Sequence, residues 1–418
     1  MARLLFVLML VLASVVSVKA DAGDLVRAGV QARERGELDR AIDYFSRAIA
    51  GGGLTPAVLA RLMIVRGVTY DMKNDLPRAI DDFGSAIKIM PHLAEAFIDR
   101  GLSWARVPDP ARAIADFSEA ARLDPTQAFL ALSNRGNVYK NLGEDMRAVA
   151  DYNEAIRLRP DYPASFYNRG LVYSGQEDFQ RAIVDFTTAL KADPSFGDAL
   201  VNRSAAYAAT GDLERAMADL DAAIRINPLD SIAFGNRGTL RISQGEFARA
   251  LIDFDAAVGL KPKVGQAYAM RGIARFYSGQ PDSAIDDLTT AARLSPSDAA
   301  TLIWLHTIRV RAGHDDLTDL ETSAARIDRK QWPAPIVDLH LGVLRTEALQ
   351  DLQLPYSGIA MQRTRKCELH FQLGVFHLEE GRSDQARREL ETALEICIPG
   401  SIERTVARVE LRALVSKP

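Results

Sequence analysis

The triplet Asn-Arg-Gly stands at Asn134–Gly136, again at Asn168–Gly170 and again at Asn236–Gly238, with Asn202–Ser204 as a near match between the last two. Successive copies are 34 residues apart, and in each copy an aspartate follows the arginine by 16 positions. A fixed period of this length is typical of a repeat array. The sequence therefore predicts one long array of similar units instead of two or three unrelated domains.

The remainder of the period predicts two helices per unit. An alanine, an aromatic residue or leucine, and a second alanine follow at spacings of four and three, as in Ala182, Phe186 and Ala189, and these share one helical stripe. A small residue, such as Gly170, precedes the first alanine by twelve positions and lets two antiparallel helices approach closely. A proline ends each unit, because proline cannot continue a helix. The prolines are Pro91, Pro125, Pro160, Pro194, Pro228, Pro262 and Pro296.

This pattern resembles the tetratricopeptide (TPR) repeat. The resemblance implies an all-α, right-handed superhelical solenoid of helix-turn-helix hairpins, in which neighbours stack because one hairpin cannot bury its apolar face alone. We expect eight tandem repeats over residues 21–298 and degenerate helical repeats over 299–366. A final TPR-like hairpin with a C-terminal capping helix is expected over 367–418.

Residues 1–20 have the pattern of a signal peptide. Arg3 precedes an apolar run from Leu4 to Val16, and small residues at Val18 and Ala20 suit cleavage before Asp21. The run is too short to span a bilayer, and no later apolar stretch is long enough to do so. No lipidation cysteine follows it. We therefore expect an exported protein, periplasmic or secreted, without a membrane span.

Seven arginine–aspartate pairs repeat at the 16-residue spacing. Residues that flank the turn of an antiparallel hairpin at this spacing lie at similar heights, so we predict semi-buried ion pairs within or between hairpins. The alternative is that the arginines bind an anionic ligand. The pairs are Arg66 with Asp82, Arg100 with Asp116, Arg135 with Asp151, Arg169 with Asp185, Arg203 with Asp219, Arg237 with Asp253, and Arg271 with Asp287.

The asparagine of each triplet is the main candidate for binding. In the TPR pattern this residue tends toward the concave surface, so Asn134, Asn168, Asn202 and Asn236 are expected to form a column. A carboxamide donates and accepts hydrogen bonds and can hold a peptide backbone without reading its sequence. The alternative is a set of solvated asparagines without a role. The other predicted groove residues are Asn137, Lys140, Tyr167, Ile273 and Phe276.

The chain has two cysteines, Cys367 and Cys397, near the two ends of the predicted final hairpin. Antiparallel packing brings these ends together, and an oxidising compartment permits a bridge. We predict a structural disulfide; two free thiols are the alternative.

No pattern for catalysis or cofactor binding is present. The six histidines lack an adjacent ligand set; for example, His370 and His377 stand two turns apart without a metal-binding motif. Acidic and basic residues are interspersed, with 51 Lys and Arg against 55 Asp and Glu, so no basic stripe indicates nucleic acid. We expect no enzyme activity, no cofactor, no metal and no nucleic-acid partner.

The end of the chain resembles TPR lipoproteins of the NlpI type. The similarity lies in Gln331-Trp332-Pro333, Ile336–Gly342, Glu368–Gly374 and Ile402-Glu403. It implies a periplasmic, often dimeric adaptor that brings a protease to peptidoglycan hydrolases. The chain departs from that family by lacking the lipidation cysteine and by having a longer array. The alternative function is that of a structural subunit in an envelope or secretion assembly.

Overall fold

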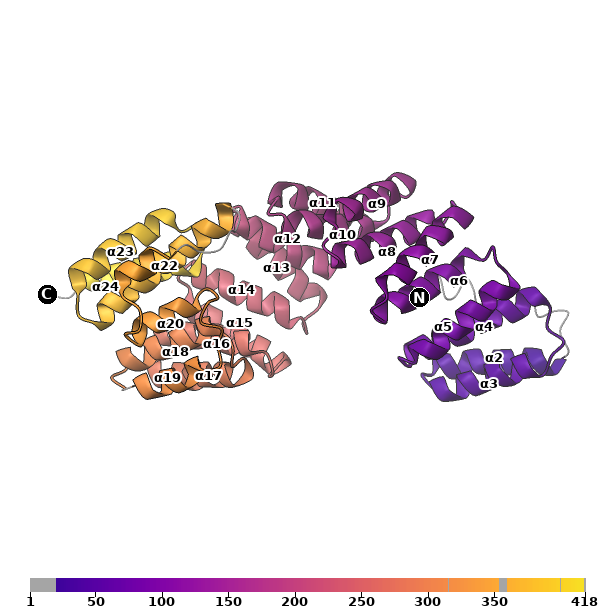
Figure 1. The fold of residues 1–418 in the computed structure, drawn as a ribbon, viewed down its shortest axis with the longest axis horizontal. Coiled ribbons are helices and arrows are strands. Elements are labelled where there is room, and N and C mark those ends of the chain that lie inside the picture. The colour runs from indigo at the N-terminus through magenta and orange to yellow at the C-terminus, as the bar shows by residue number, and fades with distance from the viewer. Residues whose placement is uncertain (1–19, 315, 353–358, 399, 417–418) are drawn as a thin grey trace. The chain divides into compact units, whose positions relative to one another are not determined.

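The computed structural model describes residues 20–314, 316–352, 359–398 and 400–416. Residues 1–19 of the predicted signal peptide lie outside the described residues. All regular structure in the described ranges is helical, with 23 helices and no strand, and the helices form a TPR-like solenoid of hairpins (Figure 1). The chain divides into two compact units, Met1–Pro194 and Ser195–Pro418, which are described separately.

The unit Met1–Pro194 consists of successive helical hairpins, each packed on the next (Figure 1). Its helices are α2 (Ala20–Glu34), α3 (Leu38–Ala50), α4 (Pro56–Met72), α5 (Leu76–Ile89), α6 (Ala94–Arg106), α7 (Pro110–Leu123), α8 (Ala128–Asn141), α9 (Asp145–Leu158), α10 (Pro163–Gly175) and α11 (Phe179–Ala192).

Each hairpin closes around a small residue and an aromatic ring. In α10–α11, Ala182 and Ala189 are fully buried, and a Cβ atom added to Gly170 would lie 2.8 Å from the Phe186 ring. Only glycine allows the two backbones this approach without moving the ring. The same contact joins Gly67 to Phe83 and Gly136 to Tyr152. The predicted close packing of the two helices is confirmed.

The unit Ser195–Pro418 begins with three similar hairpins and then becomes irregular. The hairpins are α12 (Gly197–Ala209) with α13 (Leu213–Ile226), α14 (Ser231–Ser243) with α15 (Phe247–Leu260), and α16 (Gly265–Tyr277) with α17 (Pro281–Leu294). Helix α18 (Ala299–Arg311) is followed by the short α19 (Leu317–Ala324), α20 (Ala334–His340) and α21 (Thr346–Gln350).

The last helices are α22 (Ile359–Glu379), α23 (Ser383–Ile396) and α24 (Ile402–Ser416). The predicted disulfide is present: Cys367 and Cys397 join α22 to the end of α23 with their Cα atoms 4.8 Å apart. Both sulfurs are buried in a cluster with Phe371 and Leu390. The bridge therefore fixes the open end of the α22–α23 hairpin.

Helix α24 contacts the C-terminal ends of three earlier helices of the same unit, α14, α16 and α18. The hydroxyl of Thr405 donates to the Ser243 carbonyl at 2.6 Å, at the end of α14. The buried Glu410 carboxylate accepts the Tyr277 hydroxyl at 2.7 Å, at the end of α16, and the Arg311 guanidinium, at the end of α18. Helix α24 thus ties α14, α16 and α18 together, besides packing on α22 and α23.

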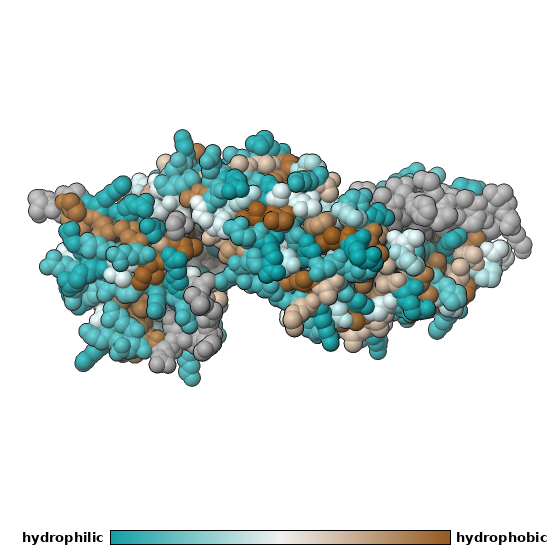
Figure 2. Space-filling model, turned by 90° about the horizontal axis from the view of Figure 1, so that it is seen from above, coloured by the Kyte–Doolittle hydropathy of each residue, from teal (hydrophilic) through white to brown (hydrophobic). Residues whose placement is uncertain are grey.

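Figure 2 shows one face of the molecule, where hydrophilic residues predominate and apolar residues form small separate groups. None of the described helices combines the length and the apolar character needed to cross a membrane.

Candidate peptide-binding site and arginine–aspartate pairs

All seven predicted arginine–aspartate pairs form, each between the two helices of one hairpin. In α10–α11, Arg169 Nε donates to Asp185 Oδ2 at 2.8 Å and Nη2 donates to Oδ1 at 2.7 Å. The Asp185 side chain is 4% exposed, so this bidentate pair is largely withdrawn from water. The other six pairs are also bidentate: Arg66–Asp82, Arg100–Asp116, Arg135–Asp151, Arg203–Asp219, Arg237–Asp253 and Arg271–Asp287.

In several of these pairs the remaining guanidinium nitrogen, Nη1, donates a hydrogen bond to a residue of the preceding hairpin. Arg169 Nη1 donates to Asn153 Oδ1 of α9 at 2.5 Å, and Arg271 Nη1 donates to Asp255 Oδ1 of α15 at 2.8 Å. The bond to Asp185 raises the pKa of Arg169 above its ordinary value. These arginines therefore hold hairpins together internally and to their neighbours, which confirms the structural interpretation. The same contact joins Arg66 to Ser46, Arg135 to Ser118 and Arg237 to Asp221.

A second contact, between an arginine guanidinium and an aromatic ring, also repeats along the array. It was not predicted from the sequence. The guanidinium of Arg181, at the start of α11, stacks over the Tyr173 ring of α10 with 4.3 Å to the ring centre. The signal was an arginine eight residues after the aromatic residue that follows the small residue of the first helix by three positions. Stacking covers the ring while the charge stays partly in water. Equivalent pairs are Tyr70–Arg78, Trp104–Arg112, Tyr139–Arg147 and Tyr207–Arg215.

In the unit Met1–Pro194, the predicted groove residues differ in how far they are available. Asn134 and Asn168 are partly exposed on α8 and α10. The Asn137 carboxamide oxygen accepts the buried Tyr152 hydroxyl at 2.7 Å, so that oxygen is committed to the hairpin interior. The Tyr167 ring packs 5.8 Å from that of Phe186. Lys140 is half-buried, and burial lowers its pKa.

In the unit Ser195–Pro418, one predicted groove residue is buried and another is partly buried. Ile273 is only 3% exposed, and Phe276 packs against the α16–α18 core with the Arg311 guanidinium 4.9 Å over its ring. The burial of Ile273 contradicts its placement on an open groove, whereas Phe276 keeps part of its surface exposed. The amide of Asn202 donates to the Asp198 carbonyl of its own helix at 2.8 Å.

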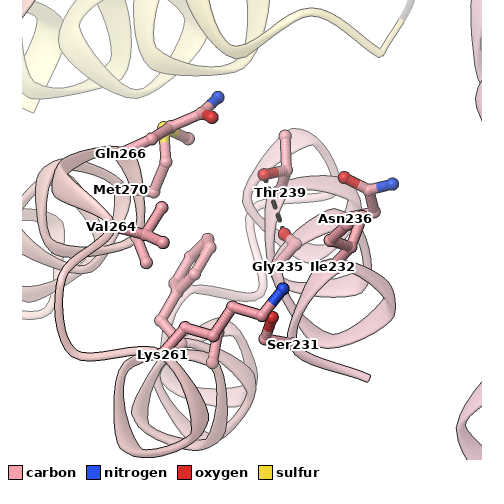
Figure 3. A pocket seen from close by; sticks show the side chains of 12 residues that line it. Ser231, Ile232, Gly235, Asn236, Thr239, Lys261, Val264, Gln266 and Met270 are labelled. Atoms are coloured by element: carbon pink, nitrogen blue, oxygen red, sulfur yellow. Dashed lines mark hydrogen bonds between the residues drawn. The ribbon is translucent and has the colours of Figure 1, made fainter. Parts of the chain in front are cut away.

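Asn236 is the predicted residue that lines a pocket. A cavity of about 300 Å³ opens between α14, α15 and α16, and Figure 3 shows Asn236 and Ile232 on one side with Val264 and Met270 opposite. Ile232 and Val264 are 57% and 42% exposed. The lining residues are Ser231, Ile232, Gly235, Asn236, Thr239, Phe254, Ala257, Lys261, Val264, Gln266, Ala267 and Met270.

The pocket combines an apolar interior with a few polar groups. Phe254, Ala257 and Met270 provide apolar walls, whereas Asn236 offers a carboxamide and Lys261 an ammonium group. Such a composition suits one apolar side chain of a bound segment whose flanking backbone or carboxylate is held by hydrogen bonds. The predicted column is divided, since Asn134 and Asn168 belong to one unit and Asn202 and Asn236 to the other.

Comparison with known proteins agrees with the repeat pattern. A family model described as TPR repeat matches residues 136–177, and one described as tetratricopeptide repeat matches residues 167–231. No curated protein sequence matches the chain. The stretch 136–231 is thus built of tetratricopeptide repeats, and hairpins of the same kind recur on both sides of it in the TPR-like solenoid.

Solved TPR structures resemble parts of the chain. A tetratricopeptide repeat protein from Parabacteroides merdae is 21% identical over 59% of this chain and 97% of its own, with a TM-score of 0.46. PilW, described as a type IV pilus biogenesis factor, is 19% identical over 52% of this chain and 98% of its own, with a TM-score of 0.46. YrrB, described as a TPR protein with an unusual peptide-binding site, is 24% identical over 44% and 95%, with a TM-score of 0.38.

Proposed function

We propose that this chain is a non-enzymatic adaptor that binds a segment of another protein in the pocket between α14 and α16. The observation that carries the proposal is the exposure of Ile232 and Val264 at the mouth of an apolar pocket beside Asn236. Exposed apolar side chains around a concave site are typical of surfaces that bind protein segments. The TPR hairpins serve as the rigid support for this surface.

The physical basis is burial of one anchor side chain. An aliphatic side chain that leaves water for the walls formed by Phe254 and Met270 gains roughly 1.5–3 kcal/mol. A hydrogen bond between Asn236 and the bound backbone adds about 1 kcal/mol. Lys261 favours a segment that carries an acidic group near the anchor. The affinity supplied by this one pocket is moderate. Further contacts of the bound segment with the first helices of neighbouring hairpins increase it.

We further propose that the adaptor works outside the cytoplasm. The apolar N-terminal segment has the pattern of an export signal, and the Cys367–Cys397 disulfide is of a kind that persists in oxidising compartments. The resemblance of the C-terminal segment to NlpI-type proteins suggests as clients a periplasmic protease or cell-wall hydrolases, with the chain acting as a dimer. A structural place in an envelope or secretion assembly is the competing function.

Site-specific crosslinking tests the pocket. A photo-crosslinking amino acid replaces Ile232 in cells, and a matched variant carries it at Ile252, which is 67% exposed on α15 and outside the pocket. The expected result is crosslinks at position 232 to one discrete segment of a partner, several-fold above those at position 252. Equal labelling at both positions would refute the site.

The partner peptide found in this way then tests the asparagine. Asn236→Ala should weaken its binding roughly threefold to tenfold, the loss expected for one hydrogen bond. Asn141→Ala, at the exposed end of α8 and outside the predicted groove residues, is the control and should leave the affinity unchanged. The partner's identity separates the two functions: a soluble protease or hydrolase favours the adaptor, and a secretion or outer-membrane subunit favours the structural component.

A further inference from the structure

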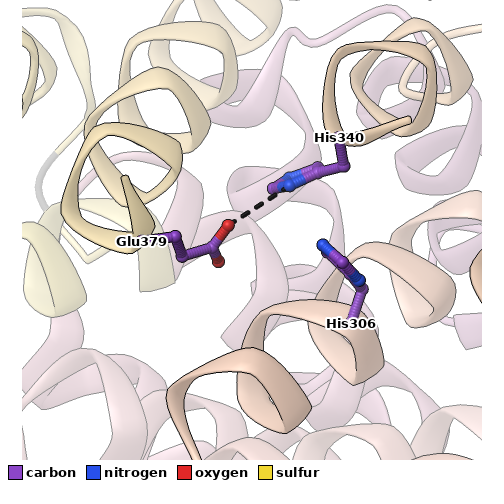
Figure 4. Close-up of side chains that lie close together, drawn as sticks. All are labelled: His306, His340 and Glu379. Atoms are coloured by element: carbon purple, nitrogen blue, oxygen red, sulfur yellow. Dashed lines mark ion pairs between the residues drawn. The ribbon is translucent and has the colours of Figure 1, made fainter. Parts of the chain in front are cut away.

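Three buried side chains meet among the irregular helices of the unit Ser195–Pro418. His306 comes from α18, His340 from α20 and Glu379 from α22 (Figure 4). Their side chains are 4%, 1% and 5% exposed. One nitrogen of each histidine and one carboxylate oxygen all lie within 4.8 Å of one another. No other such group occurs among the described residues.

The His306 ring is oriented by a second carboxylate. Its Nδ1 lies 3.0 Å from Asp316 Oδ2, and the other oxygen of Asp316 accepts from Arg309 at 2.5 Å. A carboxylate kept ionised by an arginine favours a proton on Nδ1, which leaves a lone pair on Nε2. Figure 4 shows the second ring nitrogen of His306 directed toward His340 and Glu379. Metal-binding histidines are commonly held in this way by a carboxylate behind them.

The other two side chains already have the separation of ligands on one ion. His340 Nδ1 lies 3.2 Å from Glu379 Oε2, and two ligand atoms on a tetrahedral zinc ion with bonds of about 2.05 Å are about 3.3 Å apart. His340 Nε2 and Glu379 Oε1 are buried and have no hydrogen-bond partner among the described residues. These two atoms of the centre are therefore left unsatisfied by the described residues, although polar groups buried in a protein normally have partners.

We propose that His306, His340 and Glu379 form a binding site for a divalent transition-metal ion of the zinc type. The ligands are His306 Nε2, His340 Nδ1 and a Glu379 carboxylate oxygen. Two imidazoles and one carboxylate suit zinc, whereas magnesium and calcium require oxygen ligands in larger number. His306 moves toward the ion by side-chain rotation, since the 4.8 Å limit exceeds the spacing of bound ligands.

A cavity borders the proposed site on the side of Glu379. Glu379 also lines a cavity of about 370 Å³ between α18, α22 and α24, together with Arg311 and Glu410. An ion can enter through this cavity, and a water molecule there can fill the fourth position. The bound ion would fasten α20 to α18 and α22, which are the helices that follow the regular repeats.

A similar pair in the same unit provides the matched control. His370 Nδ1 lies 2.6 Å from Glu389 Oε2, between α22 and α23, but the part of the chain that the structure describes places no third ligand beside it. A histidine–glutamate ion pair is therefore common to the proposed metal site (His340–Glu379) and to the control (His370–Glu389). Only the first has a second histidine with a free lone pair directed at it.

Titration with Co²⁺ tests the site, because four-coordinate Co²⁺ absorbs visible light far more strongly than the hydrated ion. The purified full chain, treated with a chelator and dialysed, should bind one equivalent of Co²⁺ with this absorption, and Zn²⁺ should displace it. His370→Ala should behave like the unchanged protein. His306→Ala and His340→Ala should lose the absorption, and Asp316→Asn should weaken binding about 10–100-fold.

Two results would overturn the proposal. One is the absence of the four-coordinate absorption in the unchanged protein, which needs no variant that might misfold. The other is equal loss in His370→Ala and His340→Ala, with circular dichroism showing that both are folded. Glu379→Gln keeps the shape of the side chain and serves where an alanine variant fails to fold; it should weaken Co²⁺ binding at least about tenfold.

Discussion

The internal hairpins and the final hairpin solve the same packing problem with different chemistry. In α10–α11 the charged pair Arg169–Asp185 links the two helices, whereas in α22–α23 the equivalent positions hold Leu373 and Glu389. Leu373 is fully buried, and Glu389 pairs with His370, which lies one turn earlier on α22. The close approach at the small residue is common to both hairpins, with Gly170 against Phe186 and Gly374 against Leu390.

The difference follows from what each hairpin contacts. An internal arginine such as Arg169 also donates to the hairpin before it, so its charge fixes the register between neighbours as well as within the hairpin. The final hairpin instead carries a covalent bridge and the contacts of α24. The arginine–aspartate pairs thus stabilise the internal hairpins, which have a neighbour on each side. Apolar burial and the disulfide stabilise the final hairpin α22–α23.

The largest effect is expected when one half of an internal pair is removed. Arg169→Leu leaves the buried Asp185 unpaired and should lower the free energy of opening α10–α11 by roughly 3–5 kcal/mol. Arg169→Leu with Asp185→Leu imitates apolar packing and should regain most of this loss. Hydrogen exchange of the α10–α11 amides measures both; losses that simply add would mean that the pair is not coupled.

The final hairpin should depend on its disulfide to a similar degree. Replacing both Cys367 and Cys397 with serine should destabilise α22–α24 by about 3–4 kcal/mol, since the bridge closes a loop of 30 residues in the unfolded chain. Hydrogen exchange in α4–α5 should stay unchanged in the same sample. The mass of the unreduced protein gives an independent check, because two alkylated thiols would show that the bridge is not formed.

A carboxyl in the final hairpin should make its stability depend on pH. Burial raises the pKa of Glu368 to about 7, although Trp332 Nε1 donates to its carboxylate at 2.6 Å. Between pH 4.5 and 7 the folded state keeps a proton that the unfolded state releases, so stability should fall by up to about 3 kcal/mol as pH rises. Glu368→Gln should remove this slope; parallel curves of unfolding free energy against pH would contradict the assignment.

The smallest effect concerns the feature that both kinds of hairpin share. Gly170→Ala should cost about 1–3 kcal/mol, because the new Cβ lies 2.8 Å from the Phe186 ring. Gly374→Ala should cost a similar amount, since its new Cβ would lie 2.6 Å from the Leu390 side chain. Gly175→Ala is the control: it meets open space on α10 and should be neutral or slightly stabilising. Urea unfolding compares the three; a Gly175→Ala as costly as Gly170→Ala would mean that contact with the ring does not decide the effect.

The sequence predicted the repeated hairpin well because its determinants are local. The glycine, the aromatic residue and the Arg169–Asp185 spacing all act within 16 residues, so their partners follow from helical geometry. The sequence did not decide whether the arginine contacts lie within a hairpin or between hairpins. The structure shows both: Arg169 bonds to Asp185 of its own hairpin and to Asn153 of the hairpin before. The disulfide was also predictable, since antiparallel helices bring Cys367 and Cys397 together.

The groove and the histidine cluster could not be predicted in the same way. Ile273 has the helical position of a groove residue, but it is buried, and no local pattern in the sequence indicates this. His306, His340 and Glu379 meet only because short irregular helices follow the array. The pocket around Asn236 likewise requires Val264 and Met270 of the next hairpin at a defined distance.

The contacts of α24 have a consequence for biosynthesis. Each hairpin of the unit Met1–Pro194 can close as soon as its own two helices have left the ribosome. In the other unit, the Ser243 carbonyl, the Tyr277 hydroxyl and the Arg311 guanidinium wait for Thr405 and Glu410, which are made roughly a hundred or more residues later. The second unit therefore reaches its final form only after translation of residues 402–416. Until then the ends of α14, α16 and α18 lack their contacts with α24 and are accessible to chaperones.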